Sequence, residues 1–152
     1  MYVCGDVDEL IEKYLSDSNI AFFDHNQNRM DPRDCIYDEF NAIMQLGKND
    51  PNQNYKDDPQ TMYDQVKGYQ DEGYPSHNGL ITGMVILRRH NEKDCIRVME
   101  DWWTEIKYGS KRDQLSFNYV AWKNKTKFNY MDGDSRDNQY FKRHTKSHKG
   151  VR

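Results

Sequence analysis

Two apolar runs of strand length stand in an otherwise polar chain, and they limit the possible folds more than any other feature. One run covers residues 19–23, and the other covers residues 80–87 with Gly83 inside it. Short continuous apolar runs bounded by turn-forming residues are typical of buried strands. With 152 residues, of which 36% are hydrophobic, the chain has enough apolar surface for one core. We therefore expect one domain built around a small sheet.

Segments with helical spacing alternate with these strands. The expected helices cover residues 35–46, 59–72, 92–107 and 112–123, and an earlier helix carries Leu10, Ile11, Tyr14 and Leu15 on one face. The expected helix caps are Asp6 or Asp8 for the first helix, then Asp34, Asp58, Asn91 and Ser110. Two further short strands are expected at residues 2–4 and 128–131. The alternation predicts a mixed α/β fold in which helices flank a small mixed sheet.

The helix expected at residues 92–107 contains two adjacent tryptophans, Trp102 and Trp103. Adjacent positions on a helix point in different directions, so one of the two faces the core and the other does not. Trp103 is in phase with Ile96, Met99 and Ile106. We therefore expect Trp103 in the core and Trp102 free to contact a ligand or a partner.

Composition excludes several classes of protein. The net charge is −3, and the chain has no long basic block before its C-terminal tail, which argues against a dedicated nucleic-acid binder. No apolar run approaches 18 residues, so no membrane span is expected, and the N-terminus lacks the pattern of a signal peptide. The three cysteines, Cys4, Cys35 and Cys95, lack CxxC spacing, and they predict neither a disulfide framework nor a zinc site. A reducing compartment such as the cytoplasm is the expected location.

The segment at residues 110–117, Ser-Lys-Arg-Asp-Gln-Leu-Ser-Phe, is the strongest candidate for a functional site. It places Arg112, Asp113 and Gln114 within one turn at an expected helix start. Sugar hydroxyls both donate and accept hydrogen bonds, so a sugar site needs donors and acceptors together. The alternative for Asp113 is structural, because Ser110 and Asp113 have the spacing of a capping box. Both interpretations remain open from the residues alone.

Three motifs together resemble a known family. They are the segment 110–117, the turn Gly73-Tyr74-Pro75, and the stretch from Arg33 to Glu39, Arg-Asp-Cys-Ile-Tyr-Asp-Glu. The pattern resembles a family of glycosyltransferase-like domains found in bacteria, viruses and plants. That family was once filed as a domain of unknown function and is linked to plant ceramidase-like and mucilage-related proteins. The resemblance implies a partial three-layer domain of the A-type (GT-A) nucleotide-diphospho-sugar transferase fold.

The resemblance also implies roles for particular residues. In retaining enzymes of the A-type fold, a similar Asp-Gln pair points into the sugar cleft, so Asp113 and Gln114 are implied to be catalytic residues that contact the transferred sugar or the acceptor. The residues implied to bind substrate are Arg112, Thr82, Gly83, Tyr74, Asn78 and Trp102. A glycine within a strand lets a ligand or another backbone approach closely, although Gly83 could equally mark a β-bulge. The loop at residues 73–79 is rich in turn-forming residues and could close over the site.

A divalent cation, Mn²⁺ or Mg²⁺, is implied by the same resemblance. His148 would complete its coordination, and Lys149 would contact the phosphates of the donor, because both charges stabilise a leaving diphosphate. The basic tail could instead be simply solvated. Asp6 and Asp8 form a literal Asp-x-Asp that could bind the metal, but both are equally good helix caps. The Asp-Gly-Asp after Met131 lies late in the chain and predicts mainly a turn.

The sequence resembles the acceptor-side portion of such a domain, with residues 1–142 as the domain and 143–152 as a basic tail. The donor-binding portion is expected on another chain or absent, in which case the chain alone would bind nucleotide sugars weakly or not at all. The expected function is sugar transfer from a nucleotide-sugar donor to a glycan or other acceptor. The alternatives are a non-catalytic carbohydrate-binding or structural relic and an unrelated viral interaction domain with tryptophan anchors, Trp122 among them.

Overall fold

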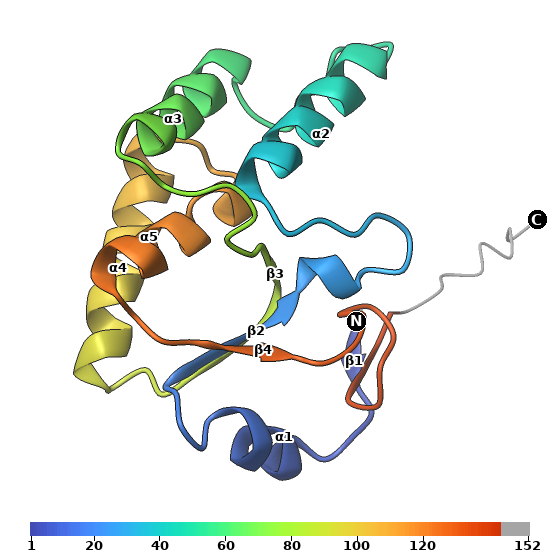
Figure 1. Cartoon of the computed structure of the whole chain (residues 1–152). Coiled ribbons are helices and arrows are strands. Elements are labelled where there is room, and N and C mark those ends of the chain that lie inside the picture. The colour runs from blue at the N-terminus through green and yellow to red at the C-terminus, as the bar shows by residue number, and fades with distance from the viewer. Residues whose placement is uncertain (144–152) are drawn as a thin grey trace, which may run out of the picture.

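The structure, a computed structural model, describes residues 1–143 and is organised around a three-stranded mixed sheet (Figure 1). The central strand, β2 (Ile20–Asp24), pairs antiparallel with β3 (Ile81–Arg88) and parallel with β4 (Asn129–Met131). Two short strands, β1 (Tyr2–Val3) and β5 (Phe141–Lys142), form a separate antiparallel pair. The prediction of an α/β domain with a small mixed sheet is therefore confirmed.

The helices lie close to their predicted positions. They are α1 (Val7–Tyr14), α2 (Ile36–Asn49), α3 (Pro59–Asp71), α4 (Lys93–Tyr108) and α5 (Phe117–Asn124), with short 3₁₀ turns η1 (His25–Gln27) and η2 (Asp113–Leu115). The helix expected at 112–123 is thus divided, because η2 forms a separate turn before α5 begins.

Two of the predicted helix caps are confirmed, and three are wrong. Asp6 accepts hydrogen bonds from the first turn of α1, and Asp58 does so for α3. The residues at the N-cap positions of α2 and α4 are Cys35 and Glu92 rather than Asp34 and Asn91, and neither makes a side-chain cap bond. Ser110 does not cap a helix either, because its hydroxyl is bound elsewhere, as described below.

The two faces of β2 belong to different parts of the core. Ile20 and Phe22 pack with side chains from α2, α3, α4 and α5, whereas Ala21 and Phe23 pack with α1, β4 and β5. This alternation is what a two-sided buried strand requires, since successive side chains point to opposite faces. Figure 1 shows α1 on one side of the sheet and the larger group of helices on the other. A third apolar cluster joins α2 and α3 to Leu115 of η2.

The orientation predicted for the tryptophan pair is wrong. Trp102 is buried with Cys95 and Val98 along the inner face of α4, whereas 62% of the Trp103 surface is exposed. Helix α4 has two apolar faces that differ by one position in the sequence, one that contains Trp102 and one that contains Trp103. The hydrogen bond of the indole determines which of the two faces the core. The Trp102 N–H donates to the carbonyl of Asp113 at 3.1 Å, which satisfies its polar atom inside the core.

A β-bulge interrupts the pairing of β2 with β3. Phe22 lies opposite Ile86, but the next residue, Phe23, lies opposite Thr82. The residues between them on β3, which include Gly83, are therefore outside the regular ladder. Bulges bend a strand and redirect its side chains, and they are frequent beside functional sites. No helix among residues 1–143 is both long and apolar enough to span a membrane.

Candidate functional site

The Asp113–Gln114 pair of η2 lies against the bulge in β3. The side-chain amide of Gln114 donates to the carbonyl oxygen of Ile81 at 2.9 Å. A Cβ atom added to Gly83 would lie closer than 3.0 Å to Oδ2 of Asp113. Only a residue without a side chain leaves room for this carboxylate, so Gly83 is both part of a bulge and a point of close approach. From the sequence we expected both side chains to face a concave surface shared with Thr82, Gly83 and the 73–79 loop; the structure places both beside β3, and their role in binding stays a prediction.

The capping-box alternative for Asp113 is wrong. Its Oδ1 accepts a hydrogen bond from the backbone N–H of Gln114 at 3.0 Å, and it makes no contact with Ser110. The hydroxyl of Ser110 instead donates to Oδ2 of Asp57 at 2.7 Å, and the backbone N–H of Lys111 reaches the same oxygen. Asp57, which lies before α3, therefore holds the segment between α4 and η2 by these hydrogen bonds in place of a local helix cap.

A buried ionic cluster lies next to Asp113. Glu39, in the first turn of α2, has only 4% of its side chain exposed, and it accepts from the Nε of Arg33 at 2.9 Å. Arg112 reaches the other oxygen of Glu39 at 3.5 Å, and Arg33 is also paired with Asp31. Burying charges costs free energy, and even a well-paired buried ion pair often adds no net stability. Stability alone therefore does not explain why this cluster is buried. We therefore treat this cluster, which includes the chain neighbour of Asp113, as a candidate part of a functional site.

His25 follows the end of β2 and lies within this cluster. Burial lowers the pKa of His25, with Arg33 acting in the same direction and Glu39 opposing it. The imidazole is therefore held in its neutral form at neutral pH. Within the described residues, its Nδ1 and the Nε of Arg112 are buried without a hydrogen-bond partner. Buried polar atoms are rarely left unpaired, so these two atoms mark the cluster as incompletely satisfied.

The loop after β4 closes one side of the cluster. Asp134 is buried and accepts hydrogen bonds from the backbone N–H groups of Arg29 and Arg136. Burial opposes ionisation of Asp134, but these N–H donors prevail and lower its pKa. The guanidinium of Arg136 donates to Asn28 at 3.2 Å. The Asp-Gly-Asp segment is therefore a turn, as predicted, with Gly133 at a positive φ of 93°.

The structure brings together some of the predicted substrate-binding residues and separates others. Arg112, Thr82 and Gly83 lie with Asp113 and Gln114 around the bulge. Tyr74 and Trp102 are only 3% and 7% exposed, and their rings pack in the aromatic core. Their placement contradicts a role in direct ligand contact, because packing against neighbouring aromatic rings already uses their surface.

Asn78 lies in a different place, an open groove of about 690 Å³ between α5 and the loop before β3. Glu72, Trp122 and Lys123 line the same groove. The 73–79 loop is tied to α2 rather than to η2, since the hydroxyl of Tyr37 donates to the carbonyl of Tyr74 at 2.7 Å.

The predicted Mn²⁺ or Mg²⁺ site does not assemble among the described residues. The carboxylate of Asp6 caps α1 by accepting from the N–H groups of Asp8 and Glu9. Neither Asp6 nor Asp8 belongs to a group of three potential metal ligands within residues 1–143. His148 and Lys149 lie outside the described residues. Asp6 and Asp8 therefore form no metal-ligand group within residues 1–143, and the part of the prediction that rests on His148 and Lys149 stays a prediction.

Sequence reasoning missed His25, Asp134 and the ion pair between Arg33 and Glu39. The motif from Arg33 to Glu39 had been singled out only for its resemblance to a family, without a role for each residue. From the sequence alone, an acidic residue in the first turn of a helix is expected to be exposed to solvent, where it interacts favourably with the helix dipole. Only its burial, which depends on distant segments, identifies it as part of a site.

Comparison with known proteins identifies the family of the chain. The family model described as TOD1/MUCI70, glycosyltransferase-like domain, matches residues 3–145. No curated protein and no solved structure matches the chain. The matched span contains the bulge, η2 and the ionic cluster. Because the match covers nearly the whole sequence, the chain belongs to the TOD1/MUCI70 family of glycosyltransferase-like domains.

Proposed function

We propose that this domain takes part in transferring a sugar from a nucleotide-sugar donor to a hydroxyl acceptor, with Asp113 and Gln114 contacting the sugar. The observation that carries the proposal is the carboxylate of Asp113 lodged against Gly83, one residue along the chain from Arg112, which belongs to the buried cluster with Arg33 and Glu39. Membership of a glycosyltransferase-like family supports the reaction class at a coarse level.

The reaction requires a new bond between the acceptor oxygen and the anomeric carbon, while the bond from that carbon to the diphosphate breaks. The acceptor hydroxyl loses a proton, and the diphosphate leaves with negative charge. Arginine is well suited to the leaving group, because its planar guanidinium binds phosphate oxygens in a bidentate manner. Arg112 is the candidate for that role, since its side chain is 29% exposed and its Nε has no partner.

The sugar itself needs oriented donors and acceptors. One amide hydrogen of Gln114 is used by Ile81, which fixes the side chain and leaves its oxygen to accept from a sugar hydroxyl. Asp113 is held in the same way by the N–H of Gln114. Side chains that are already held by the protein lose little entropy when a ligand binds. An A-type sugar-transferase architecture is part of this proposal, and no step of it uses a metal ion.

The test is a transfer assay with UDP- and GDP-sugars that measures release of nucleoside diphosphate, together with calorimetry on the same panel. Gln114→Ala and Asp113→Asn should each reduce transfer or binding by at least tenfold while the melting temperature stays within a few degrees. Matched controls are Gln45→Ala and Asp64→Asn, which alter exposed residues on α2 and α3. Equal activity in the site variants and the controls would remove Asp113 and Gln114 from the mechanism.

A second candidate function, carbohydrate binding without transfer, is favoured by the groove that contains Asn78. Its lining combines a partly exposed indole, Trp122, with an amide and two charged groups, Glu72 and Lys123. Apolar surface with a few oriented polar groups is typical of small-molecule sites. Under this alternative, Trp122→Ala would abolish glycan binding, whereas Gln114→Ala would leave it unchanged.

A further inference from the structure

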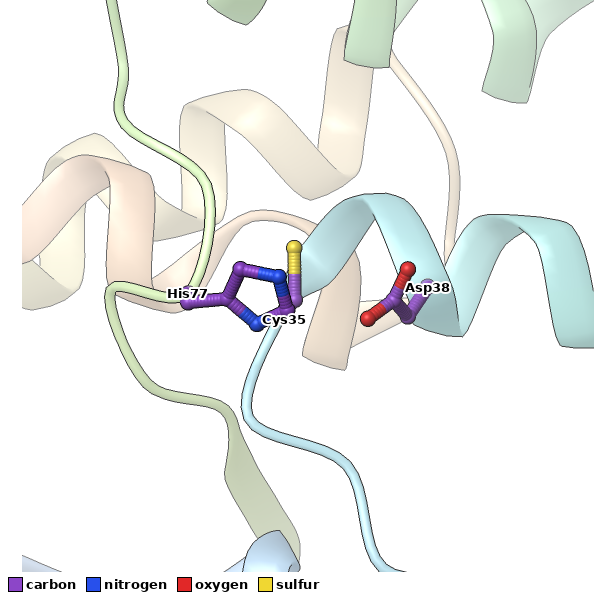
Figure 2. A group of neighbouring side chains, drawn as sticks. All are labelled: Cys35, Asp38 and His77. Atoms are coloured by element: carbon purple, nitrogen blue, oxygen red, sulfur yellow. The ribbon is translucent and has the colours of Figure 1, made fainter.

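Three side chains of different chemistry converge where the 73–79 loop meets the start of α2. The thiol of Cys35, the carboxylate of Asp38 and the imidazole of His77 place one ligand atom each within 4.8 Å of one another. Figure 2 shows the ring of His77 beside the sulfur of Cys35, with the carboxylate of Asp38 in the first turn of α2. These are the only residues in the described part of the chain that form such a group.

We propose that Cys35, Asp38 and His77 bind a divalent cation of the zinc class, which fastens the 73–79 loop to the N-terminus of α2. The proposal concerns a separate site and does not depend on the proposed sugar transfer. It also revises the expectation from cysteine spacing, which had given no zinc site. That expectation considered only neighbouring cysteines, whereas this set combines two segments distant in sequence.

A fourth residue orients the imidazole in the way that metal sites require. Nδ1 of His77 lies 2.8 Å from Oδ1 of Asp34. Histidines that bind metals usually donate their other ring N–H to a carboxylate, which fixes the tautomer and the ring orientation. Since Nδ1 is engaged by Asp34, Nε2 is the nitrogen that is left for a cation. This arrangement also explains why Asp34 does not cap α2 as the sequence had suggested.

The donor set selects the class of metal. Thiolate, imidazole and carboxylate together suit zinc, whereas Mg²⁺ and Ca²⁺ prefer oxygen ligands alone. Bond lengths of about 2.3 Å to sulfur and about 2.0 Å to nitrogen bring such ligands to roughly 3.5 Å from each other. Side-chain movements on the order of 1 Å close the existing group to that separation. Asp38 and His77 are exposed, so the site is open to solvent and water can supply the fourth ligand.

The backbone conformation of the 73–79 loop already holds His77 close to the start of α2. His77 adopts a left-handed conformation with φ of 53°, which is uncommon for a residue other than glycine. Such conformations persist where the surroundings impose them, and they concentrate at functional sites. The hydrogen bond from Tyr37 to the carbonyl of Tyr74 holds the same two segments together. A cation would add to this link by joining Cys35 and Asp38 to His77.

Cobalt provides the direct test, because a thiolate bound to Co²⁺ gives a near-ultraviolet charge-transfer band and tetrahedral Co²⁺ absorbs in the visible. Chelator-treated protein would be titrated with Co²⁺, and Zn²⁺ should then displace it and raise the melting temperature through mass action. Cys35→Ser should abolish the charge-transfer band, and His77→Gln should weaken Co²⁺ affinity at least tenfold. Asp34→Asn should weaken it about 10- to 100-fold by releasing the ring.

The matched controls are the other two cysteines and the exposed His90. Cys4→Ser, Cys95→Ser and His90→Gln should all retain both the band and the affinity. Absence of a thiolate band in the wild-type protein would overturn the proposal. So would a band that survives Cys35→Ser, because it would place the metal on another thiol.

Discussion

The middle of β2 and the residue just past its end are buried to a similar extent, yet they are surrounded by opposite chemistry. In the middle of the strand, Phe22 is fully buried and packs against the rings of Trp102, Phe117 and Phe128. Just past its end, His25 is 5% exposed and lies among arginines and carboxylates. The aromatic region has an evident reason to exist, since burial of apolar surface stabilises the fold. The charged region buries no comparable apolar surface. We therefore propose that it serves the sugar-transfer reaction rather than the stability of the fold.

The aromatic region should give the largest loss of stability. Phe22→Ala removes a ring that contacts three other aromatic rings, and large-to-small changes of this type cost about 3–5 kcal/mol. Urea unfolding followed by circular dichroism would measure the change. Trp103→Ala on the exposed face of α4 is the control and should cost less than about 1 kcal/mol. A small loss for Phe22→Ala would mean that the core does not depend on these ring contacts.

The ionic cluster should be the next most sensitive region when it loses one partner. Glu39→Gln leaves Arg33 and Arg112 without their shared carboxylate, and breaking a buried pair in this way costs about 3 kcal/mol. Asp71→Asn, which removes the exposed partner of Lys67 on α3, should cost about 0.5 kcal/mol or less. The same urea experiment compares them. Similar small values for both variants would show that the cluster is solvated rather than buried.

The neutral state of His25 should appear as a pH dependence of stability. Because the pKa of His25 is lower in the folded protein, the unfolded chain binds more protons below a pH of about 6.5. The free energy of unfolding should therefore fall as the pH decreases through that value and on toward the folded pKa. His25→Gln should flatten this part of the profile, whereas His90→Gln, at an exposed position, should not. An unchanged slope in His25→Gln would contradict the buried neutral imidazole.

The smallest stability effect, and the most informative about the site, is expected at Gly83. A methyl group there meets the flexible end of the Asp113 side chain, so Gly83→Ala should cost about 1 kcal/mol or less while displacing that carboxylate. Gly68→Ala, in α3 with open space around it, should stabilise the protein by about 0.5–1 kcal/mol. Transfer or sugar binding should fall only in Gly83→Ala. Equal activity in both variants would show that the position of the Asp113 carboxylate does not matter for transfer or sugar binding.

The sequence predicted the framework of the molecule better than its site. The strand runs at residues 19–23 and 80–87 are recognisable because apolar side chains dominate both runs in an otherwise polar chain. The inner face of α4 was mistaken because two stripes, one through Trp102 and one through Trp103, are almost equally apolar. Local spacing alone cannot show that the Trp102 N–H finds an acceptor across the fold.

The site divides in the same way. The Asp113–Gln114 pair was predicted because acid, amide and basic residues stand together in one segment. His25 was not singled out, Glu39 was noted only as part of a family motif and Asp134 only as part of a turn, because only the fold brings the three residues to one place. The proposed metal site has the same origin, since Cys35 and His77 belong to separate segments.

The central claim is that the charged end of β2, and not another face, receives the sugar. Chemical-shift mapping of the ¹⁵N-labelled chain during titration with nucleotide sugars and glycans to millimolar concentration tests it directly, even if binding is weak. The account predicts that the largest shifts occur at the amides of Gly83, Asp113 and Gln114, and that Gln114→Ala removes them. Shifts confined to the groove around Asn78 and Trp122, or unchanged in Gln114→Ala, would contradict it.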